Sequence, residues 1–373
     1  MNNRYAVLLF GPELQNKKAF YGSGTGGYTR NMSVYLQTFI SNEFELVPCY
    51  HSVRVSGKLQ FLSFPFRLLK DIYAFIKSVQ LYKPSIIHIL GQYRSATPRE
   101  YFIVLISKLF RKKIVYEIKA GVFIEFFRSA NPVYKYMIGY ILNQSSVILV
   151  EGEVYIDFIR NRYPQKKVFW FPNFVPYEEL PPKLKPKLTG ELLSVLFAGY
   201  CYEGKGVYEL VKGLNLAAEK GIKINLTLIG KESPDFKNWL NNFSANANLQ
   251  INRMGVMPHQ LVLQCMREQD IYLYPSRHPG EGHNNSINEA MMNNMVIVSS
   301  KIGFLTSVLA DGAYFLKQVD MNEIAMVIDH ISTHKKEALE KAAKANKRLA
   351  DRYTSKIQIP ALVKYYKDAI SEK

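Results

Sequence analysis

The chain has 373 residues, 48% of them hydrophobic, and a formal net charge of +17. This length suggests two domains, and 21% charged residues exclude a disordered or fibrous chain. The cysteines Cys49, Cys201 and Cys265 lie far apart, which argues against a disulfide framework or a cysteine zinc site and favours a reducing cytosol. No apolar run reaches roughly 18 residues, and the N-terminal run is typical of a strand, so we expect neither a spanning helix nor a signal peptide.

Short β-rich runs alternate with helical patterns along the first half of the chain. We predict strands at 5–10, 45–49, 86–90, 113–118, 147–150 and 168–171. We predict helices at 27–40, 64–81, 98–110, 132–142 and 154–163. This alternation is typical of an open parallel sheet with helices on both faces.

Residues 176–186, PYEELPPKLKP, contain four prolines and interrupt this alternation, so we interpret them as part of a linker. After them the alternation resumes. We predict strands at 194–198, 225–229, 249–251, 271–274, 296–299 and 313–316, and helices at 206–220, 234–243, 258–269, 286–293 and 321–349. The sequence thus predicts an α/β protein with two Rossmann-like, doubly wound domains at 1–178 and 189–353, joined by a linker at 179–188. A last helix is predicted at 354–373, and packing of this helix back on the first domain is left open.

A glycine cluster, YGSGTGGYTRN, lies between the first strand and the first helix. Its glycines are Gly22, Gly24, Gly26 and Gly27. Glycine allows close approach of the backbone to a ligand, and a helix N-terminus offers N–H groups to an anion. Contact with a phosphate or a sugar and an ordinary surface loop are both compatible with this weak signal.

A second cluster, PSRHPGEGHNNSINE at 275–289, follows a predicted strand and precedes a helix. Ser286 and Glu289 have the spacing of a capping box, which predicts that the helix begins at Ser286. The N–H groups of residues 284–287 would then point toward an anion such as a diphosphate. Glu281 and Glu289, eight positions apart, could accept hydrogen bonds from sugar hydroxyls; alternatively, Glu289 only caps the helix and Glu281 is a solvated loop acid.

The stretch EGHNNSINEAMMNNMVIVSSKIGF resembles the nucleotide-sugar signature of the family-four retaining glycosyltransferases of bacterial polysaccharide assembly. That signature has two glutamates separated by seven residues, then Glu-Ala-Met and a buried strand. Further pieces resemble the family in the right order: GTGGY, FPNFV, FAGYCYEGKGVYELVKGL, LTLIGKES and MGVMPHQLVLQCMREQDIYLYPS. The resemblance implies the GT-B fold, in which two Rossmann-like domains face each other across a cleft.

The resemblance also implies roles for individual residues. Glu289 matches the glutamate that holds the ribose hydroxyls, Glu281 the one beside the donor sugar, and Lys205 the lysine that compensates the diphosphate. Gly26 and Gly27 match the loop that lets the first domain approach the donor. The remaining donor-site residues are Gly282, His283, Asn284, Asn285 and Ser286.

Two positions depart from the family pattern. Tyr200 stands where the family has an arginine, and Arg277 or Lys231 could replace that charge. Lys119 stands near the family's histidine, so we expect it to be the third catalytic residue beside Glu281 and Lys205. No Asp-x-Asp motif occurs, and His278 and His283 have no third ligand nearby, so we expect neither a metal nor a cofactor; the co-substrate would be a nucleoside-diphosphate sugar, a UDP-sugar being favoured.

The first half is basic and aromatic: residues 1–180 hold 23 basic and 12 acidic residues. Around 54–83, aromatic and aliphatic residues alternate with Lys58, Arg67, Lys70 and Lys77. This segment is either a patch for an anionic membrane or a helix with a buried apolar face and solvated lysines. Nucleic acid is a less favoured partner, because no nucleic-acid motif occurs.

The sequence therefore predicts a cytoplasmic, metal-independent retaining glycosyltransferase, peripheral at the inner face of the plasma membrane. Its acceptor would be a glycan, lipid-linked, in capsule, exopolysaccharide or O-antigen assembly. Two alternatives stay open: a nucleotide-sugar epimerase on the same fold and a non-catalytic scaffold subunit.

Overall fold

The computed structural model describes residues 4–14, 26–52 and 63–371. These residues form two compact units. Among the described residues, the first unit contains 4–14, 27–176 and 355–371, and the second contains Gly26 and 177–354. Gly22, Gly24 and Lys58, which the sequence analysis singled out, lie outside the described residues.

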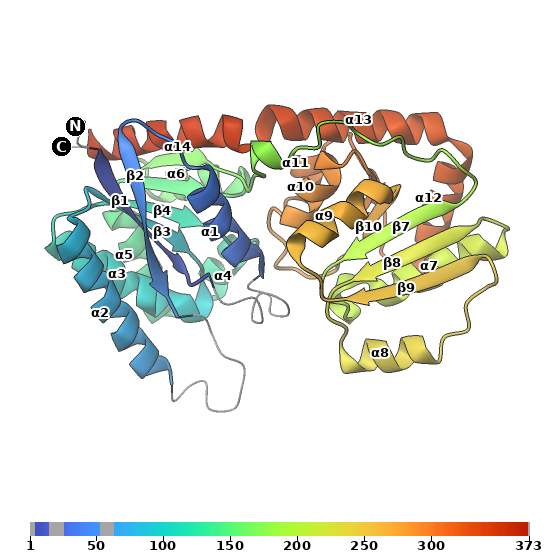
Figure 1. The fold of residues 1–373 in the computed structure, drawn as a ribbon. Coiled ribbons are helices and arrows are strands. Elements are labelled where there is room, and N and C mark those ends of the chain that lie inside the picture. The colour runs from blue at the N-terminus through green and yellow to red at the C-terminus, as the bar shows by residue number, and fades with distance from the viewer. Residues whose placement is uncertain (1–3, 15–25, 53–62, 372–373) are drawn as a thin grey trace. The chain divides into compact units, whose positions relative to one another are not determined.

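The first unit is built on a six-stranded sheet in the order β2-β1-β3-β4-β5-β6 (Figure 1). All of its strand pairs are parallel. The strands are β1 (Tyr5–Pro12), β2 (Phe44–His51), β3 (Ile86–Gly91), β4 (Lys113–Ile118), β5 (Val147–Val150) and β6 (Lys167–Trp170). Each lies within two residues of its predicted limits, because parallel strands buried on both faces are continuous apolar runs.

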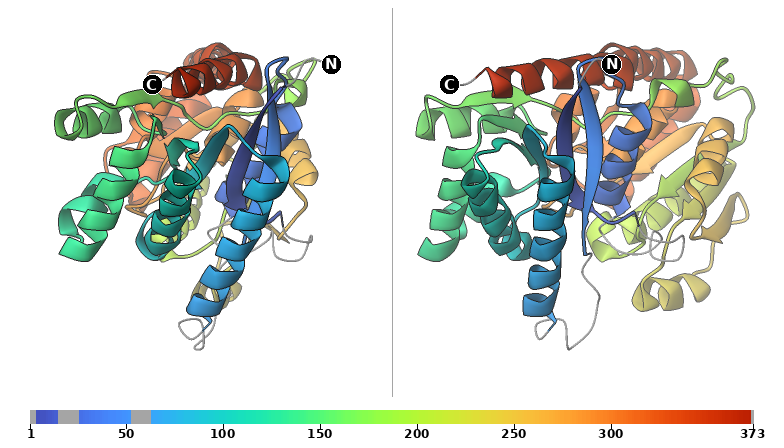
Figure 2. Two further views of the ribbon diagram at one scale, coloured as in Figure 1. Left: turned by 90° about the vertical axis from the view of Figure 1, so that its left-hand side faces the viewer. Right: turned by 60° about the vertical axis from the view of Figure 1, so that its left-hand side comes forward.

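Helices cover both faces of this sheet, as Figure 2 shows. They are α1 (Gly26–Thr38), α2 (Phe64–Tyr82), α3 (Thr97–Leu109), α4 (Phe123–Ser129), α5 (Pro132–Gln144), α6 (Val154–Arg162) and α14 (Ser355–Ile370). One face is covered by α1 and α14, whose residues Met32, Tyr35 and Leu362 share a core with alternate strand residues such as Leu9 and Val115. The short helix α4 was not predicted.

The second unit is built on another six-stranded parallel sheet, in the order β12-β11-β10-β7-β8-β9. Its strands are β7 (Leu193–Ala198), β8 (Ile224–Ile229), β9 (Leu249–Gly255), β10 (Ile271–Tyr274), β11 (Val296–Ser300) and β12 (Tyr314–Leu316). Its helices are α7 (Val207–Glu219), α8 (Pro234–Asn241), α9 (His259–Glu268), α10 (Asn285–Met292), α11 (Leu305–Leu309), α12 (Met321–Thr333) and α13 (Lys335–Arg352). The two sheets with their interleaved helices confirm the predicted pair of Rossmann-like domains.

One helix prediction in this unit is wrong, and one helix was missed. The single helix expected at 321–349 is two helices, because His334 between α12 and α13 has a non-helical backbone (φ −116°, ψ 48°). The short helix α11 was also not predicted.

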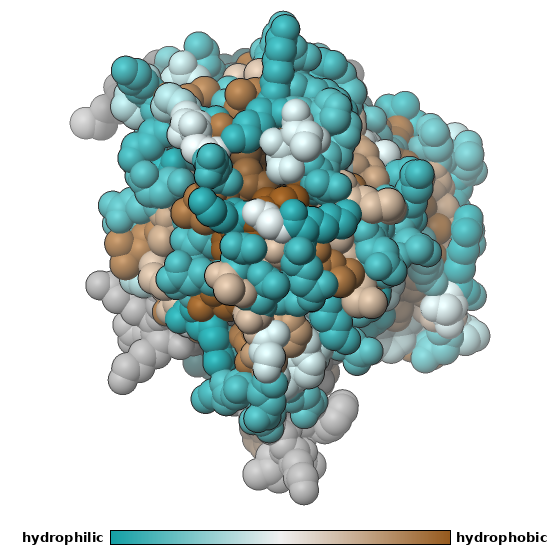
Figure 3. Space-filling model, turned by 90° about the vertical axis from the view of Figure 1, so that its right-hand side faces the viewer, coloured by the Kyte–Doolittle hydropathy of each residue, from teal (hydrophilic) through white to brown (hydrophobic). Residues whose placement is uncertain are grey.

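In the described part of the chain, no helix is long and apolar enough to cross a membrane. Figure 3 shows one face of the molecule, where hydrophilic residues predominate and hydrophobic residues form separate patches.

Candidate functional site

The site in the second unit lies where the strand order reverses. Strand β7 has β8 on one side and β10 on the other, so the chain leaves the two neighbouring strands β7 and β10 in opposite directions. In sheets of this type, ligands bind beyond the carboxyl ends of the strands at this point. The loop after β7 carries Lys205, and the loop after β10 carries Ser276 and Glu281.

Lys205 and Glu281 form an ion pair between these two loops. The Lys205 Nζ also donates to the Tyr274 hydroxyl at 2.8 Å, and Ser276 Oγ donates to Glu281 Oε1 at 2.7 Å. The side chain of Glu281 is 6% exposed and that of Lys205 is 17% exposed. The structure thus brings together two of the three predicted catalytic residues.

Glu281 is ionised in spite of its burial. Burial alone would raise the pKa of this carboxyl, but the Lys205 ammonium and hydrogen bonds from Lys205, Ser276 and Tyr274 lower the pKa below its ordinary value. The pair therefore holds a cation and an anion side by side, and their charges nearly cancel.

Two glycines make this arrangement possible. Gly206, directly after Lys205, has φ +67°, and a Cβ there would lie 2.1 Å from the Pro275 carbonyl oxygen. Gly303 has φ +56°, and its Cβ would lie 1.9 Å from the Glu281 carbonyl oxygen. A side chain at either position would clash with backbone and occupy a disfavoured conformation.

The predicted capping box at Ser286 is wrong. The N-cap of α10 is Asn284, whose Oδ1 accepts from the Ser286 N–H at 2.9 Å. Asn284 Nδ2 donates to the Tyr274 hydroxyl at 2.6 Å and to Glu281 Oε2 at 3.3 Å, which ties the helix start to the ion pair. The Ile287 N–H donates to the Asn284 carbonyl at 3.2 Å. Two of the N–H groups predicted to face an anion thus have acceptors inside the turn.

Glu289 is bonded to a residue that the sequence analysis passed over. His259 Nε2 lies 2.7 Å from Glu289 Oε1, where the Nε2–H tautomer donates to the carboxylate. Glu289 is almost buried, whereas His259 is about a quarter exposed. A histidine at the start of α9 carries no sequence signal of its own, because its partner lies 30 positions away.

The remaining predicted donor-site residues have varied surroundings. Tyr200 is 42% exposed, and its ring stacks on that of Tyr202 with centroids 5.1 Å apart. Arg277 pairs with Glu209 at 2.9 Å, so its charge is already engaged. The ring of His283 is 2% exposed and packs edge-on against Tyr353. Its Nε2 lies 2.8 Å from Asn288 Oδ1, so this histidine packs within the unit. Gly282 precedes it in the loop, and Asn285 is the first residue of α10.

Lys119, the third predicted catalytic residue, belongs to the first unit and follows β4. Its side chain is 3% exposed and pairs with Glu117 at 2.7 Å. Its Nζ donates to Asn173 Oδ1 at 2.6 Å, and Asn31 Nδ2 donates to the same oxygen at 3.0 Å. Asn173 belongs to the FPNFV segment, but its amide was not predicted to contact Lys119. Gly26 and Gly27 form the first turn of α1.

No group of three or more metal-ligating side chains that could hold an ion occurs among the described residues.

Both units are Rossmann-like, and two domains of this kind are the building blocks of the GT-B fold. Residues 182–349 match the model of the family described as glycosyl transferases group 1. No curated protein matches the sequence.

Solved structures of similar fold cover nearly the whole chain. Sucrose-phosphate synthase from Thermosynechococcus elongatus has a TM-score of 0.70 at 14% identity, over 99% of this chain and 100% of that one. A glycosyltransferase from Rickettsia africae has a TM-score of 0.70 at 15% identity, over 100% of both chains. Anabaena HepE in complex with UDP has a TM-score of 0.67 at 12% identity, over 97% of this chain and 99% of that one.

Proposed function

We propose that the protein is a retaining glycosyltransferase that uses a nucleoside-diphosphate sugar. The observation that carries this proposal is the Lys205–Glu281 pair at the reversal of strand order, inside the segment that matches the glycosyl transferase model. The proposed acceptor is a lipid-linked glycan of capsule, exopolysaccharide or O-antigen assembly.

In this proposal the diphosphate lies between Lys205 and the N-terminus of α10, and Glu289 accepts hydrogen bonds from the ribose hydroxyls. A phosphate at the helix start would compete with Asn284 Oδ1 for the Ser286 N–H, which that oxygen now accepts. Donor binding would therefore turn the Asn284 side chain away. Because Arg277 is held by Glu209, we assign the second cation to Lys231, whose exposed side chain follows β8 beside the end of β7.

The proposed chemistry follows from the charges that the reaction creates. Breaking the bond between sugar and phosphate leaves negative charge on the diphosphate and positive charge on the sugar carbon. Lys205 and the amides of α10 would stabilise the leaving group. Glu281, ionised at neutral pH, would stabilise the cationic sugar. The acceptor hydroxyl would attack from the side of the leaving group and give its proton to the diphosphate, which retains the configuration.

A nucleotide panel tests the donor site. We place UDP first, because structures of the similar HepE contain UDP and UDP-glucose. The thermal shift of the purified protein would be measured with UDP, GDP, CDP, ADP and dTDP, each with and without magnesium. A ligand bound at 100 times its dissociation constant stabilises the folded state by about 2.7 kcal/mol. A selective shift that EDTA does not abolish supports a metal-independent donor site; no shift with any nucleotide favours the scaffold alternative.

A transfer assay separates glycosyl transfer from epimerisation. An epimerase converts the nucleotide sugar without an acceptor, whereas the proposed enzyme needs one. The anomeric proton coupling of the product, measured by NMR, would show whether the configuration is retained.

The outer face of α2 supports a lipid-linked acceptor. Phe75 and Val79 are buried, but Phe66, Leu69 and Tyr73 are 76%, 64% and 70% exposed. The helix thus has a buried apolar face and an exposed one. Lys70 and Lys77 are exposed on the same helix, while its one acidic residue, Asp71, is buried and pairs with Arg99. Exposed apolar side chains flanked by cations suit an anionic membrane surface. The proposal therefore places the enzyme at the inner face of the plasma membrane.

Vesicle binding tests this placement. Lys70→Gln with Lys77→Gln should weaken binding to phosphatidylserine vesicles by about 30-fold, since each lysine contributes roughly 1 kcal/mol near such a surface. The matched control is Lys336→Gln with Lys347→Gln, which removes two exposed lysines from the second unit. Equal binding by the two double variants would remove α2 from the membrane contact.

A further inference from the structure

The first unit buries an ionised carboxylate at the carboxyl end of its sheet. Glu117 of β4 is fully buried, and its Oε1 lies 2.7 Å from Lys119 Nζ. The Tyr35 hydroxyl of α1 lies 2.7 Å and 2.9 Å from the two carboxylate oxygens and donates to them. Burial would raise the pKa of Glu117, but Lys119 and His88 lower it below the ordinary value. The carboxylate is therefore a fixed counter-ion for the Lys119 ammonium.

His88 extends these contacts to the C-terminal helix. Its Nε2 lies 3.2 Å from Glu117 Oε2, and its Nδ1 lies 2.7 Å from the Tyr366 hydroxyl of α14. A neutral ring with its proton on Nε2 satisfies both contacts, because Nε2 then donates to the carboxylate and Nδ1 accepts from Tyr366. Both ring nitrogens of His88 then have a hydrogen-bond partner.

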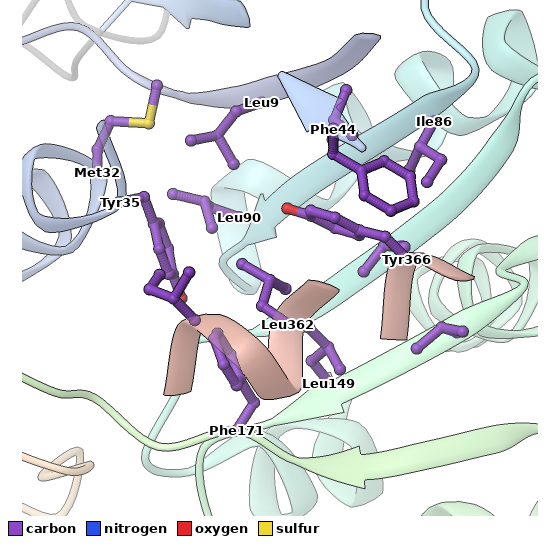
Figure 4. Close-up of a cluster of buried hydrophobic side chains, with 14 of the residues drawn as sticks. Leu9, Met32, Tyr35, Phe44, Ile86, Leu90, Leu149, Phe171, Leu362 and Tyr366 are labelled. Atoms are coloured by element: carbon purple, nitrogen blue, oxygen red, sulfur yellow. The ribbon is translucent and has the colours of Figure 1, made fainter. Parts of the chain in front are cut away.

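Helix α14 brings Tyr366 to this position by packing into the core. Tyr366 and Leu362 are fully buried and lie among Phe44, Ile86 and Leu90, as Figure 4 shows. The rings of Phe44 and Tyr366 have centroids 5.5 Å apart. The hydroxyl position thus depends on how a helix from the far end of the sequence is seated.

At its other end, the chain of contacts stops at a hollow. Lys119 donates to Glu117 and to Asn173, and no third acceptor for its ammonium lies within the described residues. Lys119 lines a narrow hollow together with Asn31, Val34, Tyr35, Asn173 and Phe174, and its Nζ lies 5.9 Å and 5.8 Å from the ring centroids of Tyr35 and Phe171. An ammonium has three donors, and these contacts supply oxygen acceptors for two of them.

We propose that Glu117, His88 and Tyr366 are positioning residues that fix the Lys119 ammonium toward this hollow, so that the seating of α14 controls the sugar-transfer step. The inference rests on the proposed function for the transfer step and on the expectation from the sequence that Lys119 is a catalytic residue. The positioning itself rests on the contacts within the first unit.

The first test is a pair of matched tyrosine variants. Tyr366→Phe removes the hydroxyl that contacts His88. Tyr365→Phe removes a hydroxyl from the neighbouring residue, whose ring stacks on Phe169 outside this chain of contacts. We expect kcat for UDP release to fall about tenfold in Tyr366→Phe, the worth of one hydrogen bond, with UDP affinity unchanged. Tyr365→Phe should match the wild type. Equal kcat values for the two variants would overturn the proposal.

An NMR readout separates this proposal from the proposed function. A buried, ion-paired ammonium exchanges its protons slowly, so its ¹⁵Nζ signal can be observed and assigned by its loss in Lys119→Met. That signal should shift in Tyr366→Phe and stay in place in Tyr365→Phe. If the signal shifts in Tyr366→Phe but the wild type transfers no sugar, the positioning of Lys119 is supported and the proposed glycosyltransferase function is refuted. An unshifted signal in an active protein would refute positioning alone.

Glu117→Gln gives a third measurement. The variant keeps the size of the side chain and removes the counter-ion that contacts Lys119, His88 and Tyr35. We expect kcat to fall while the affinity for UDP stays unchanged. An unchanged kcat in a folded variant would overturn the positioning role.

Discussion

Without the charge of Lys205, the buried Glu281 carboxylate should destabilise the folded second unit instead of stabilising it. In Lys205→Met, the carboxylate keeps its burial and its bond to Ser276 but loses the ammonium beside it. Breaking a buried ion pair costs about 3–5 kcal/mol. Because the Lys205 side chain is 17% exposed, we expect the lower end, about 3 kcal/mol at pH 7. At about 2–4 °C per kcal/mol for a unit of this size, the melting temperature should fall by roughly 6–12 °C.

The pH dependence gives the sharper signature. In the wild type the pKa of Glu281 is lowered, so its contribution to stability is present above its ordinary pKa and is lost as the pH falls through the lowered pKa. In Lys205→Met, burial raises that pKa, and the variant recovers stability as the carboxyl takes up a proton. The difference in free energy of unfolding between variant and wild type should therefore become smaller as the pH falls from 7 toward 4.

Urea unfolding followed by tryptophan fluorescence can measure this gap. The chain has two tryptophans; in a Trp170→Phe background, Trp239 of α8 reports the second unit alone. The control is Lys220→Met, which breaks an exposed pair with Asp329 at 3.4 Å and should cost less than about 1 kcal/mol. Equal losses in the two variants, or a gap that does not change with pH, would refute the reasoning.

Two further predictions concern single residues. Burial raises the pKa of Glu100 to about 7, so this group should lower the free energy of unfolding of the wild type by about 3 kcal/mol between pH 4.5 and pH 7. Glu100→Gln should not show this loss. Urea unfolding followed by the fluorescence of Trp170 would measure both proteins, and parallel pH profiles would contradict the prediction. Gly206→Ala should destabilise the second unit by at least about 2 kcal/mol, because φ is +67° and the new Cβ would lie 2.1 Å from the Pro275 oxygen; an unchanged melting temperature would show that the loop can shift.

The sequence predicted the sheets better than the helix limits. Buried parallel strands are short apolar runs bounded by polar residues, and their limits were predicted within two residues except at β9, which extends to Gly255. The run at 321–349 keeps its apolar periodicity through His334, so periodicity could not reveal the break. At the start of α10, Asn284 and Ser286 are both good capping residues. The cap in the structure is Asn284, which also contacts Tyr274 and Glu281. No local sequence pattern encodes these contacts.

Among the site residues, those in a sequence signature were predicted and those that contact them were not. Glu281, Lys205 and Glu289 were predicted because they belong to a sequence signature. Their partners Ser276 and His259 were not, although Ser276 is only five positions from Glu281. His88 is fully buried in β3. Its contact with Tyr366 joins residues 278 positions apart, and such a pair can be recognised only once the chain is folded.

The most direct test of the central claim is the affinity for UDP of the wild type and of Glu289→Gln, measured by calorimetry in EDTA. Glutamine keeps the size of the side chain and removes the charge that would accept the ribose hydroxyls. The account predicts that the wild type binds UDP without metal and that Glu289→Gln binds about 10- to 100-fold more weakly, from the loss of roughly 1.5–3 kcal/mol of charge-assisted hydrogen bonding. Equal affinity in a folded variant, or no binding by the wild type, would contradict it.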